Sequence, residues 1–220
     1  MPLSVVDHPV VRDRLSRLRD RACDPPDFRR LLAEVGSALA YEATRTLATR
    51  AVEIETPVGR AAGVHLSTPP LVAPILRAGL GFLDAFLALV PNAVVAHLGM
   101  FRDPVTLEAV PYYVNLPERL AGVDAFVLDP MLATGHSALA ALEALSRRGA
   151  ETMTFICAIA APEGVRAVER AHPRVRIVAA ALDERLNEHA YIVPGLGDAG
   201  DRLFGSTSSV PDSFRRSPTT

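Results

Sequence analysis

The sequence contains no lysine, because all 23 of its basic residues are arginine. This absence excludes a phosphate-binding loop built on lysine, a pyridoxal Schiff base and any other lysine chemistry. Guanidinium groups and main-chain amides must therefore hold any anion that the chain binds. The formal net charge is −2, and no basic run is interleaved with aromatic residues, so we expect no nucleic-acid partner.

Cysteine and long apolar runs are also scarce. Cys23 and Cys157 lie far apart, and Cys157 sits within the apolar run TFICAIAA, which predicts a buried, inert thiol. No apolar run approaches the roughly 20 residues that a membrane-spanning helix needs, and MPLSVVDHPVVRDRL carries no signal-peptide core. We therefore expect a soluble, cytoplasmic protein with no membrane partner.

The histidines lack the spacing of metal ligands. Neither an H-x-x-x-H pattern nor a Cys/His cluster occurs among His8, His65, His97, His172 and His189. We expect no protein-bound metal.

Short apolar runs alternate with helical patterns along the rest of the chain. At 220 residues and 49% hydrophobic residues, we expect one domain, over residues 1–205. Continuous apolarity indicates strands buried on both faces, as in a parallel sheet covered by helices, and hence an α/β fold. The expected strands are 71–76, 93–100, 125–129, 153–161 and 174–182, and the expected helices are 27 to about 49 (capped by Asp27), 79–89, 137–148 and 163–171.

Two segments depart from this alternation. Residues 102–117, RDPVTLEAVPYYVNLP, contain two extended pieces bounded by proline, which predict a hairpin outside the core sheet. Residues 206–220 are rich in serine, threonine and proline and predict a disordered tail.

The stretch VLDPMLATGHSA, residues 127–138, runs from an apolar strand through small residues into a helix. The strand delivers Asp129 at its carboxyl end, where open α/β sheets place their ligands. The amides of the helix start, with the hydroxyls of Thr134 and Ser137, suit a dianionic phosphate, although either hydroxyl could simply cap the helix. The preceding carboxylate of Asp129 favours a bound ligand over a simple helix cap. It can accept hydrogen bonds from both hydroxyls of a ribose whose phosphate the turn binds.

A rival motif lies near the end of the chain. GLGDAG, residues 195–200, matches the dinucleotide-binding pattern G-x-G-x-x-G. That pattern needs a helix and a further strand after it, whereas only DRLFG and the polar tail follow, so we reject a dinucleotide site. The glycines still indicate a close approach of the backbone to a ligand, near the carboxylate of Asp198.

Together these motifs resemble those of the uracil phosphoribosyltransferases. VLDPMLATGHSA is similar to the phosphoribosyl-pyrophosphate (PRPP) loop, and YIVPGLGDAGDRLFG, residues 191–205, is similar to the base-binding segment. PILRAGLGF (74–82) and GMFRDPVTLEAVPYYVNLP (99–117) resemble the arginine-bearing junction and the flexible hood. The resemblance implies the type I phosphoribosyltransferase fold, a parallel sheet flanked by helices with a small β-hairpin hood.

The resemblance also implies a reaction, in which PRPP and uracil give UMP and pyrophosphate, with Mg²⁺ carried on the pyrophosphate. Asp198 and Arg102 are the implied catalytic residues. The residues implied to bind PRPP are Arg77, Arg102, Asp129, Pro130, Met131, Leu132, Ala133, Thr134, Gly135, His136, Ser137 and Asp198. Those implied to bind uracil are Ile192, Gly197, Asp198 and Ala199.

Further expectations follow from the same resemblance. A hood over residues 102–114 would close on the substrates and exclude water. The family implies a homodimer or a higher homo-oligomer, and GTP is a candidate effector on which the sequence is silent.

One residue departs from the family pattern, because His136 stands where a second glycine is usual. Its side chain could crowd the phosphate or donate a hydrogen bond to it, although the helix dipole disfavours its cation. This departure supports the alternative function, a non-catalytic sensor that binds PRPP or UMP without turnover.

Overall fold

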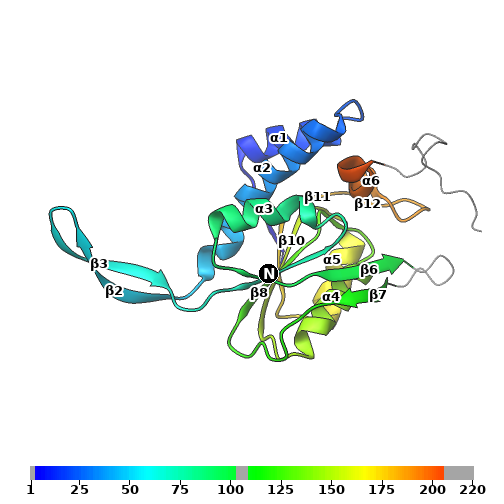
Figure 1. The fold of residues 1–220 in the computed structure, drawn as a ribbon. Coiled ribbons are helices and arrows are strands. Elements are labelled where there is room, and N and C mark those ends of the chain that lie inside the picture. Colours follow the sequence, from blue (N-terminus) through cyan, green and yellow to red (C-terminus); the bar gives the residue numbers. More distant parts are fainter. Residues whose placement is uncertain (1–2, 103–108, 206–220) are drawn as a thin grey trace, which may run out of the picture.

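The computed structural model describes residues 3–102 and 109–205, and it confirms the expected α/β fold (Figure 1). The strands of the main sheet are β1 (Leu3–Val5), β4 (Leu71–Leu76), β5 (Val94–Val95), β6 (Leu98–Arg102), β7 (Ala109–Val114), β8 (Asp124–Leu128), β9 (Met131–Leu132), β10 (Thr152–Ala160) and β11 (Arg176–Leu182). Their order is β1-β11-β10-β8-β4-β6-β7, with β5 beside β4 and β9 beside β10. The pairs are parallel except β6–β7.

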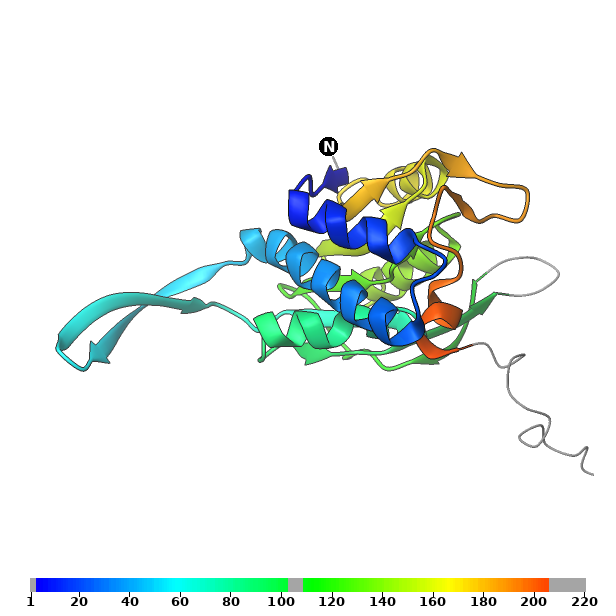
Figure 2. The same ribbon diagram turned by 90° about the horizontal axis from the view of Figure 1, so that it is seen from above.

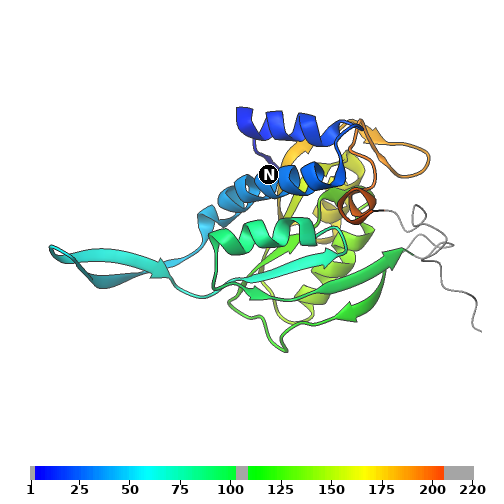
Figure 3. The same cartoon turned by 45° about the horizontal axis from the view of Figure 1, so that its top comes forward.

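Helices cover both faces of this sheet (Figure 3). One face carries α1 (Pro9–Arg19), α2 (Pro25–Ala43), α3 (Leu80–Leu89) and α6 (Ala199–Phe204), and the other carries α4 (His136–Ser146) and α5 (Pro162–Ala171). In β8, Phe126 and Leu128 pack into the core under α2, whereas Ala125 and Val127 pack into the core under α4. Because successive side chains of a strand point to opposite faces, two cores require the continuous apolar runs of the sequence.

The first predicted helix was placed too late at both ends. Asp24 rather than Asp27 is the N-cap of α2, and its carboxylate accepts a 2.9 Å hydrogen bond from the Asp27 N–H. The two prolines that follow Asp24 occupy the first helical positions, where no amide donor is needed. The helix ends at Ala43, not near residue 49, because a 3-10 turn over Thr44–Thr46 leads directly into another strand.

The predicted hairpin is present but its placement was wrong. β6 and β7 pair in antiparallel fashion, from Leu98 opposite Val114 to Arg102 opposite Ala109. β6 also pairs with β4, so the hairpin extends the main sheet at its edge instead of lying outside it. The expected strand 93–100 is accordingly split between β5 and β6. The hairpin tip, 103–108, and the predicted tail, 206–220, lie outside the described residues.

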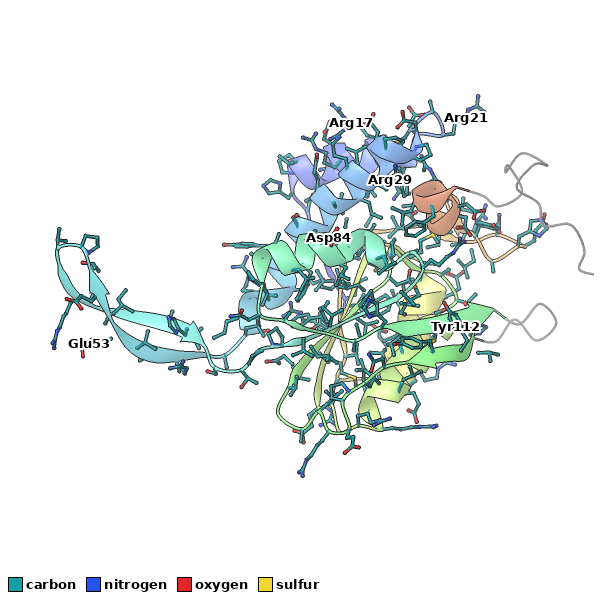
Figure 4. The ribbon with its side chains drawn as sticks, in the orientation of Figure 1. Arg17, Arg21, Arg29, Glu53, Asp84 and Tyr112 are labelled. Atoms are coloured by element: carbon teal, nitrogen blue, oxygen red, sulfur yellow. The ribbon has the colours of Figure 1, made fainter. Side chains whose placement is uncertain are left out.

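A second hairpin, which we did not predict, projects far from the body of the molecule (Figure 2). β2 (Thr49–Thr56) and β3 (Gly59–Leu66) pair along their full lengths. Glu53 lies on this arm, away from the sheet (Figure 4), and the Val58 side chain at its tip is 98% exposed. Alternation in VEIE followed by the turn residues PVG was the available signal.

A close backbone approach fixes the turn between β4 and α3. A Cβ atom at Gly79 would lie 2.3 Å from the Leu128 carbonyl oxygen and 2.6 Å from the Ile75 nitrogen. Both neighbours are main-chain atoms of central strands, so they cannot move aside. Only glycine allows the turn to rest against the end of β8.

We expect Gly79→Ala to lower the free energy of unfolding by roughly 1–3 kcal/mol or more, because the added methyl group must displace backbone. Gly63→Ala is the matched control, since its Cβ would make only an ordinary 3.4 Å contact with Ile54. The control should change stability by no more than about 0.5 kcal/mol. Urea denaturation of the two variants measures both values, and equal midpoints would contradict the proposed close approach.

Candidate active site

The site forms where the chain turns to opposite faces of the sheet. β4 and β8 are parallel neighbours, with Leu71 opposite Ala125 and Pro74 opposite Leu128. The chain leaves β4 for α3 on one face and leaves β8 through β9 for α4 on the other. Such a divergence opens a crevice at the carboxyl ends of parallel strands, where α/β proteins bind ligands. Arg77 follows β4 and Asp129 follows β8, so both begin at this crevice.

The loop after β8 is held by main-chain hydrogen bonds from β10 and the residue after it. The Pro130 carbonyl accepts hydrogen bonds from Ala158 (2.9 Å) and Ile159 (3.2 Å). The Leu132 carbonyl accepts a 2.8 Å bond from Ala161. These bonds fix the course of the loop and leave its far side to form the wall of a cavity.

The start of α4 meets the cavity through glycine. Gly135, with φ +89°, occupies the N-cap position, so neither Thr134 nor Ser137 is the N-cap residue. The Thr134 hydroxyl accepts a 3.5 Å hydrogen bond from the His136 N–H. His136 is exposed, and as the first residue of α4 it lies among amides that have no partner within the helix.

A cavity of about 320 Å³ joins the loop to the C-terminal segment. Its lining residues are Asp129, Met131, Leu132, Ala133, Thr134, Gly135, His136, Ser137, Ala138, His189, Ala190, Tyr191, Ile192 and Asp198. The two motifs singled out in the sequence, which begin at residues 127 and 191, thus face one cavity. The cavity is large enough for a small ligand and lies at the predicted edge of the sheet.

The other predicted site residues lie behind or beside this cavity. Pro130, of the predicted PRPP loop, is buried behind the wall and does not line the cavity. Gly197 lines the adjoining cavity, which shares Asp198 with the first. Ala199 is fully buried as the first residue of α6. Gly197 and Ala199 can therefore offer a ligand their main-chain groups and not their side chains.

Sequence reasoning missed part of the cavity wall. His189, Ala190 and Tyr191 lie in the turn between β12 (Arg185–Leu186) and β13 (Ile192–Val193). Asn187 shapes that turn, because its Oδ1 atom accepts hydrogen bonds from His189 N–H (3.0 Å) and Tyr191 N–H (2.9 Å). The signal was the Asn in LNEHAYIV, which favours a side-chain-capped turn.

The environment of Asp129 favours its neutral form. Burial is the main cause that raises the pKa of this carboxyl to about 7, and the negative charge of Asp198 contributes a smaller part of the same shift. A 3.4 Å hydrogen bond from the Met131 N–H lowers the pKa and only partly opposes these effects. Near neutral pH the carboxyl is therefore poised between its two forms, which is typical of functional sites.

Arginine and aspartate side chains surround the start of α6. The Asp198 carboxylate caps the helix by accepting a 2.9 Å hydrogen bond from the Asp201 N–H. The Arg77 guanidinium lies 3.5 Å from the Asp201 carboxylate, and a Cβ atom at Gly200 would lie 3.2 Å from Asp198 Oδ1 and 3.5 Å from Arg77 Nη2. Arg77 and Asp198 are therefore close together. For Arg102, the structure describes the backbone position at the end of β6.

Residues 3–102 and 109–205 contain no group of three or more His, Cys, Asp or Glu side chains able to hold a metal ion. None of the helices in this part of the chain is long and apolar enough to cross a membrane.

A known structure identifies the fold to which this arrangement belongs. The fold is similar to that of adenine phosphoribosyltransferase from Leishmania donovani, with a TM-score of 0.56 and 10% identity over 86% of this chain and 88% of that chain. At that identity the likeness concerns the fold alone, which is that of the type I phosphoribosyltransferases.

Closer relatives identify the family. The model of the uracil phosphoribosyltransferase family matches residues 5–206. Uracil phosphoribosyltransferase of Geobacillus kaustophilus (strain HTA426) is 55% identical over 203 residues, which are 92% of this chain and 97% of the relative. The structure of the AQ2163 protein from Aquifex aeolicus matches with a TM-score of 0.88 and 39% identity, over 92% of this chain and 98% of that chain. The chain belongs to the uracil phosphoribosyltransferase family.

We expect Asp129→Asn to raise the melting temperature at pH 8 and to leave it nearly unchanged at pH 4. The folded-state pKa of about 7 lies above the ordinary value of 3.8, so ionisation of Asp129 opposes folding. This penalty is absent below the ordinary pKa and is complete above the raised one. Thermal unfolding of both proteins from pH 4 to pH 8 measures the difference in melting temperature. A difference that does not vary with pH would contradict the raised pKa.

Proposed function

We propose that this chain is a uracil phosphoribosyltransferase, which transfers the 5-phosphoribosyl group from PRPP to uracil and releases UMP and pyrophosphate. The observation that carries the proposal is the shared cavity, in which the loop of Asp129 to Ser137 faces Tyr191, Ile192 and Asp198. One side suits the phosphorylated sugar and the other suits the base, so the two substrates would meet between them. Membership of the family supports the same reaction.

The charges of the cavity fit this chemistry. Breaking the bond between ribose C1 and the pyrophosphate oxygen builds positive charge on the sugar and negative charge on the leaving group. The carboxylates of Asp129 and Asp198 line the cavity and would face the sugar. The resemblance assigns Arg77 and Arg102 to the pyrophosphate. Catalysis then consists mainly of positioning and electrostatic stabilisation. Mg²⁺ enters as part of the substrate, bound to the pyrophosphate of PRPP, whose charge it partly neutralises.

The loop would hold the sugar at both ends. In its ionised form Asp129 accepts hydrogen bonds from the two ribose hydroxyls. The amides at the start of α4, near Gly135, bind the 5′-phosphate with the favourable end of the helix dipole. His136 lines the cavity at this helix start, and its side chain would add a donor to the phosphate.

Main-chain recognition would select the base. Uracil presents an N–H between two carbonyl groups, and cytosine reverses the polarity at two adjacent positions. Main-chain groups near Ile192 and from Gly197 to Ala199 cannot reorient to suit both bases. Each buried mismatch costs roughly 1–3 kcal/mol, so cytosine should be rejected by a few powers of ten. The homodimer, the GTP effector and the cytoplasmic location stay predictions.

Pyrophosphate release tests the reaction directly. The protein is mixed with Mg²⁺, PRPP and uracil, cytosine, adenine or guanine in turn, and we expect turnover with uracil alone. Asp198→Asn should lower kcat/KM by about 100-fold or more, since it removes a charge at the developing cation. Tight binding of UMP without turnover of any base would contradict the enzyme and favour the sensor.

The affinity for PRPP should depend on pH through Asp129. Because the ribose hydroxyls require the ionised carboxylate and its pKa is about 7, KM for PRPP should fall roughly tenfold from pH 6 to pH 8. Asp129→Asn should have a higher KM that varies little over this range. Steady-state kinetics at saturating uracil measure both profiles, and parallel profiles would show that another group titrates.

A further inference from the structure

The proposed base-binding segment contains a turn in which the backbone at Gly195 packs tightly against the backbone of Ile192. Gly195 has φ +67°, and a Cβ atom there would lie 2.0 Å from the Ile192 carbonyl oxygen. The turn separates Ile192, on the cavity wall, from the segment that leads through Leu196 to Asp198. Its conformation therefore determines how the main-chain groups on either side are oriented relative to each other.

An ion pair between the partly exposed Arg19 and the buried Asp183 holds both polar main-chain groups of Gly195. Asp183, which is 7% exposed, accepts a 2.9 Å hydrogen bond from the Gly195 N–H. Arg19 of α1 binds the Asp183 carboxylate through both of its terminal nitrogens and donates a 2.8 Å bond to the Gly195 carbonyl. The N-terminal helix thus holds a turn more than 170 residues away in the sequence.

A second arginine holds the next carbonyl. Arg202 Nη1 donates a 2.9 Å hydrogen bond to the Leu196 carbonyl and another bond to the Leu18 carbonyl. Its Nη2 donates to the Asp20 carbonyl at 2.6 Å, and its guanidinium lies 4.3 Å from the centre of the Phe28 ring. Burial lowers the pKa of Arg202, which reflects its withdrawal from water into this packing.

These contacts set the direction of the amides that follow. A trans peptide group is planar, so its C=O and N–H point in opposite directions. With the carbonyls of Gly195 and Leu196 turned toward the two arginines, the N–H groups of Leu196 and Gly197 must point away from them. Arg19 and Arg202 line the adjoining cavity and not the cavity of the PRPP loop.

We propose that Arg19 and Arg202 are positioning residues for base recognition, which fix the orientation of the uracil-binding main chain by holding the carbonyls of Gly195 and Leu196. The proposal rests on the proposed function. It assigns the choice between uracil and cytosine to two side chains that do not line the cavity. Without them, the peptide groups of the segment can rotate, and the fixed pattern of donors and acceptors is lost.

The kinetic test uses Arg19→Gln and Arg202→Gln. We expect KM for uracil to rise roughly tenfold, as for loss of one well-placed hydrogen bond, while KM for PRPP changes less than about twofold. The preference for uracil over cytosine should fall by a similar factor. Arg19→Lys keeps a donor and a charge for Asp183 and Gly195, so it should recover most of the affinity for uracil.

Arg176→Gln is the matched control. Arg176 also holds two main-chain carbonyls, of Glu42 (3.0 Å) and Ala43 (2.7 Å), but these lie at the end of α2. Its removal should lower stability without changing the ratio of the two KM values. Equal rises of both KM values in Arg19→Gln, or the same change in the control, would overturn the proposal.

Hydrogen exchange of backbone amides separates this proposal from the proposed function. In the unliganded protein, a peptide covering residues 192–205 should exchange faster in Arg19→Gln and Arg202→Gln, and should be unchanged in Arg176→Gln. Unchanged exchange in all three variants would refute the positioning role. Faster exchange in a protein that does not turn over uracil would refute the enzyme and leave the positioning role intact.

Discussion

The structure depends on one constraint, which is that two neighbouring parallel strands must send their chains to opposite faces of the sheet. β4 leads to α3 and β8 leads to α4, so their ends cannot cover each other. The turn at Gly79 nevertheless rests against the Leu128 carbonyl, which leaves no room for a side chain. The divergence of the two chains therefore opens the crevice, and the contact of Gly79 with Leu128 packs its base closely. Asp129 lines the crevice from the end of β8, Arg77 lies after β4 beside Asp201 of α6, and the C-terminal segment closes its other side.

Contacts between arginine side chains and main-chain carbonyls give a physical reason for arginine in place of lysine. Arg19, Arg29, Arg176 and Arg202 each donate to main-chain carbonyls of distant segments. Arg29, which Figure 4 labels on α2, donates a 2.7 Å hydrogen bond to the Leu203 carbonyl of α6. A guanidinium offers five donors in a fixed plane and can hold several carbonyls at once, which an ammonium group does less precisely. These arginines fasten α1, α2 and the C-terminal segment to one another, on the face of the sheet opposite α4.

The elements that the sequence predicted well are those buried on both faces. The strand 71–76 was exact, and β8 and β10 were displaced by only one residue, because a short, continuous apolar run bounded by turn residues is typical of a buried strand. The arm of β2 and β3 was missed because most of its residues are exposed, so its apolar residues form no core pattern. Asp24 was overlooked as a cap because the helical period begins only after its two prolines. Thr134, Gly135 and Ser137 were correctly placed at a helix start, since small residues between a strand and a helix have a distinctive pattern.

The proposed base-binding segment, residues 191–205, shows why local sequence could not reveal the whole site. Ile192 is buried and Ala199 is fully buried, so no side chain of theirs marks a ligand. A pocket built from main-chain groups can be formed by many sequences, provided that the backbone has one conformation. The specificity for the base then depends on residues that fix this backbone conformation, such as Asp183 and its partner Arg19 in the first helix. No motif connects these two positions, because they meet only when α1 packs on the sheet beside β11. A recognition site of this kind is fully determined by the sequence and yet becomes visible only in the folded chain.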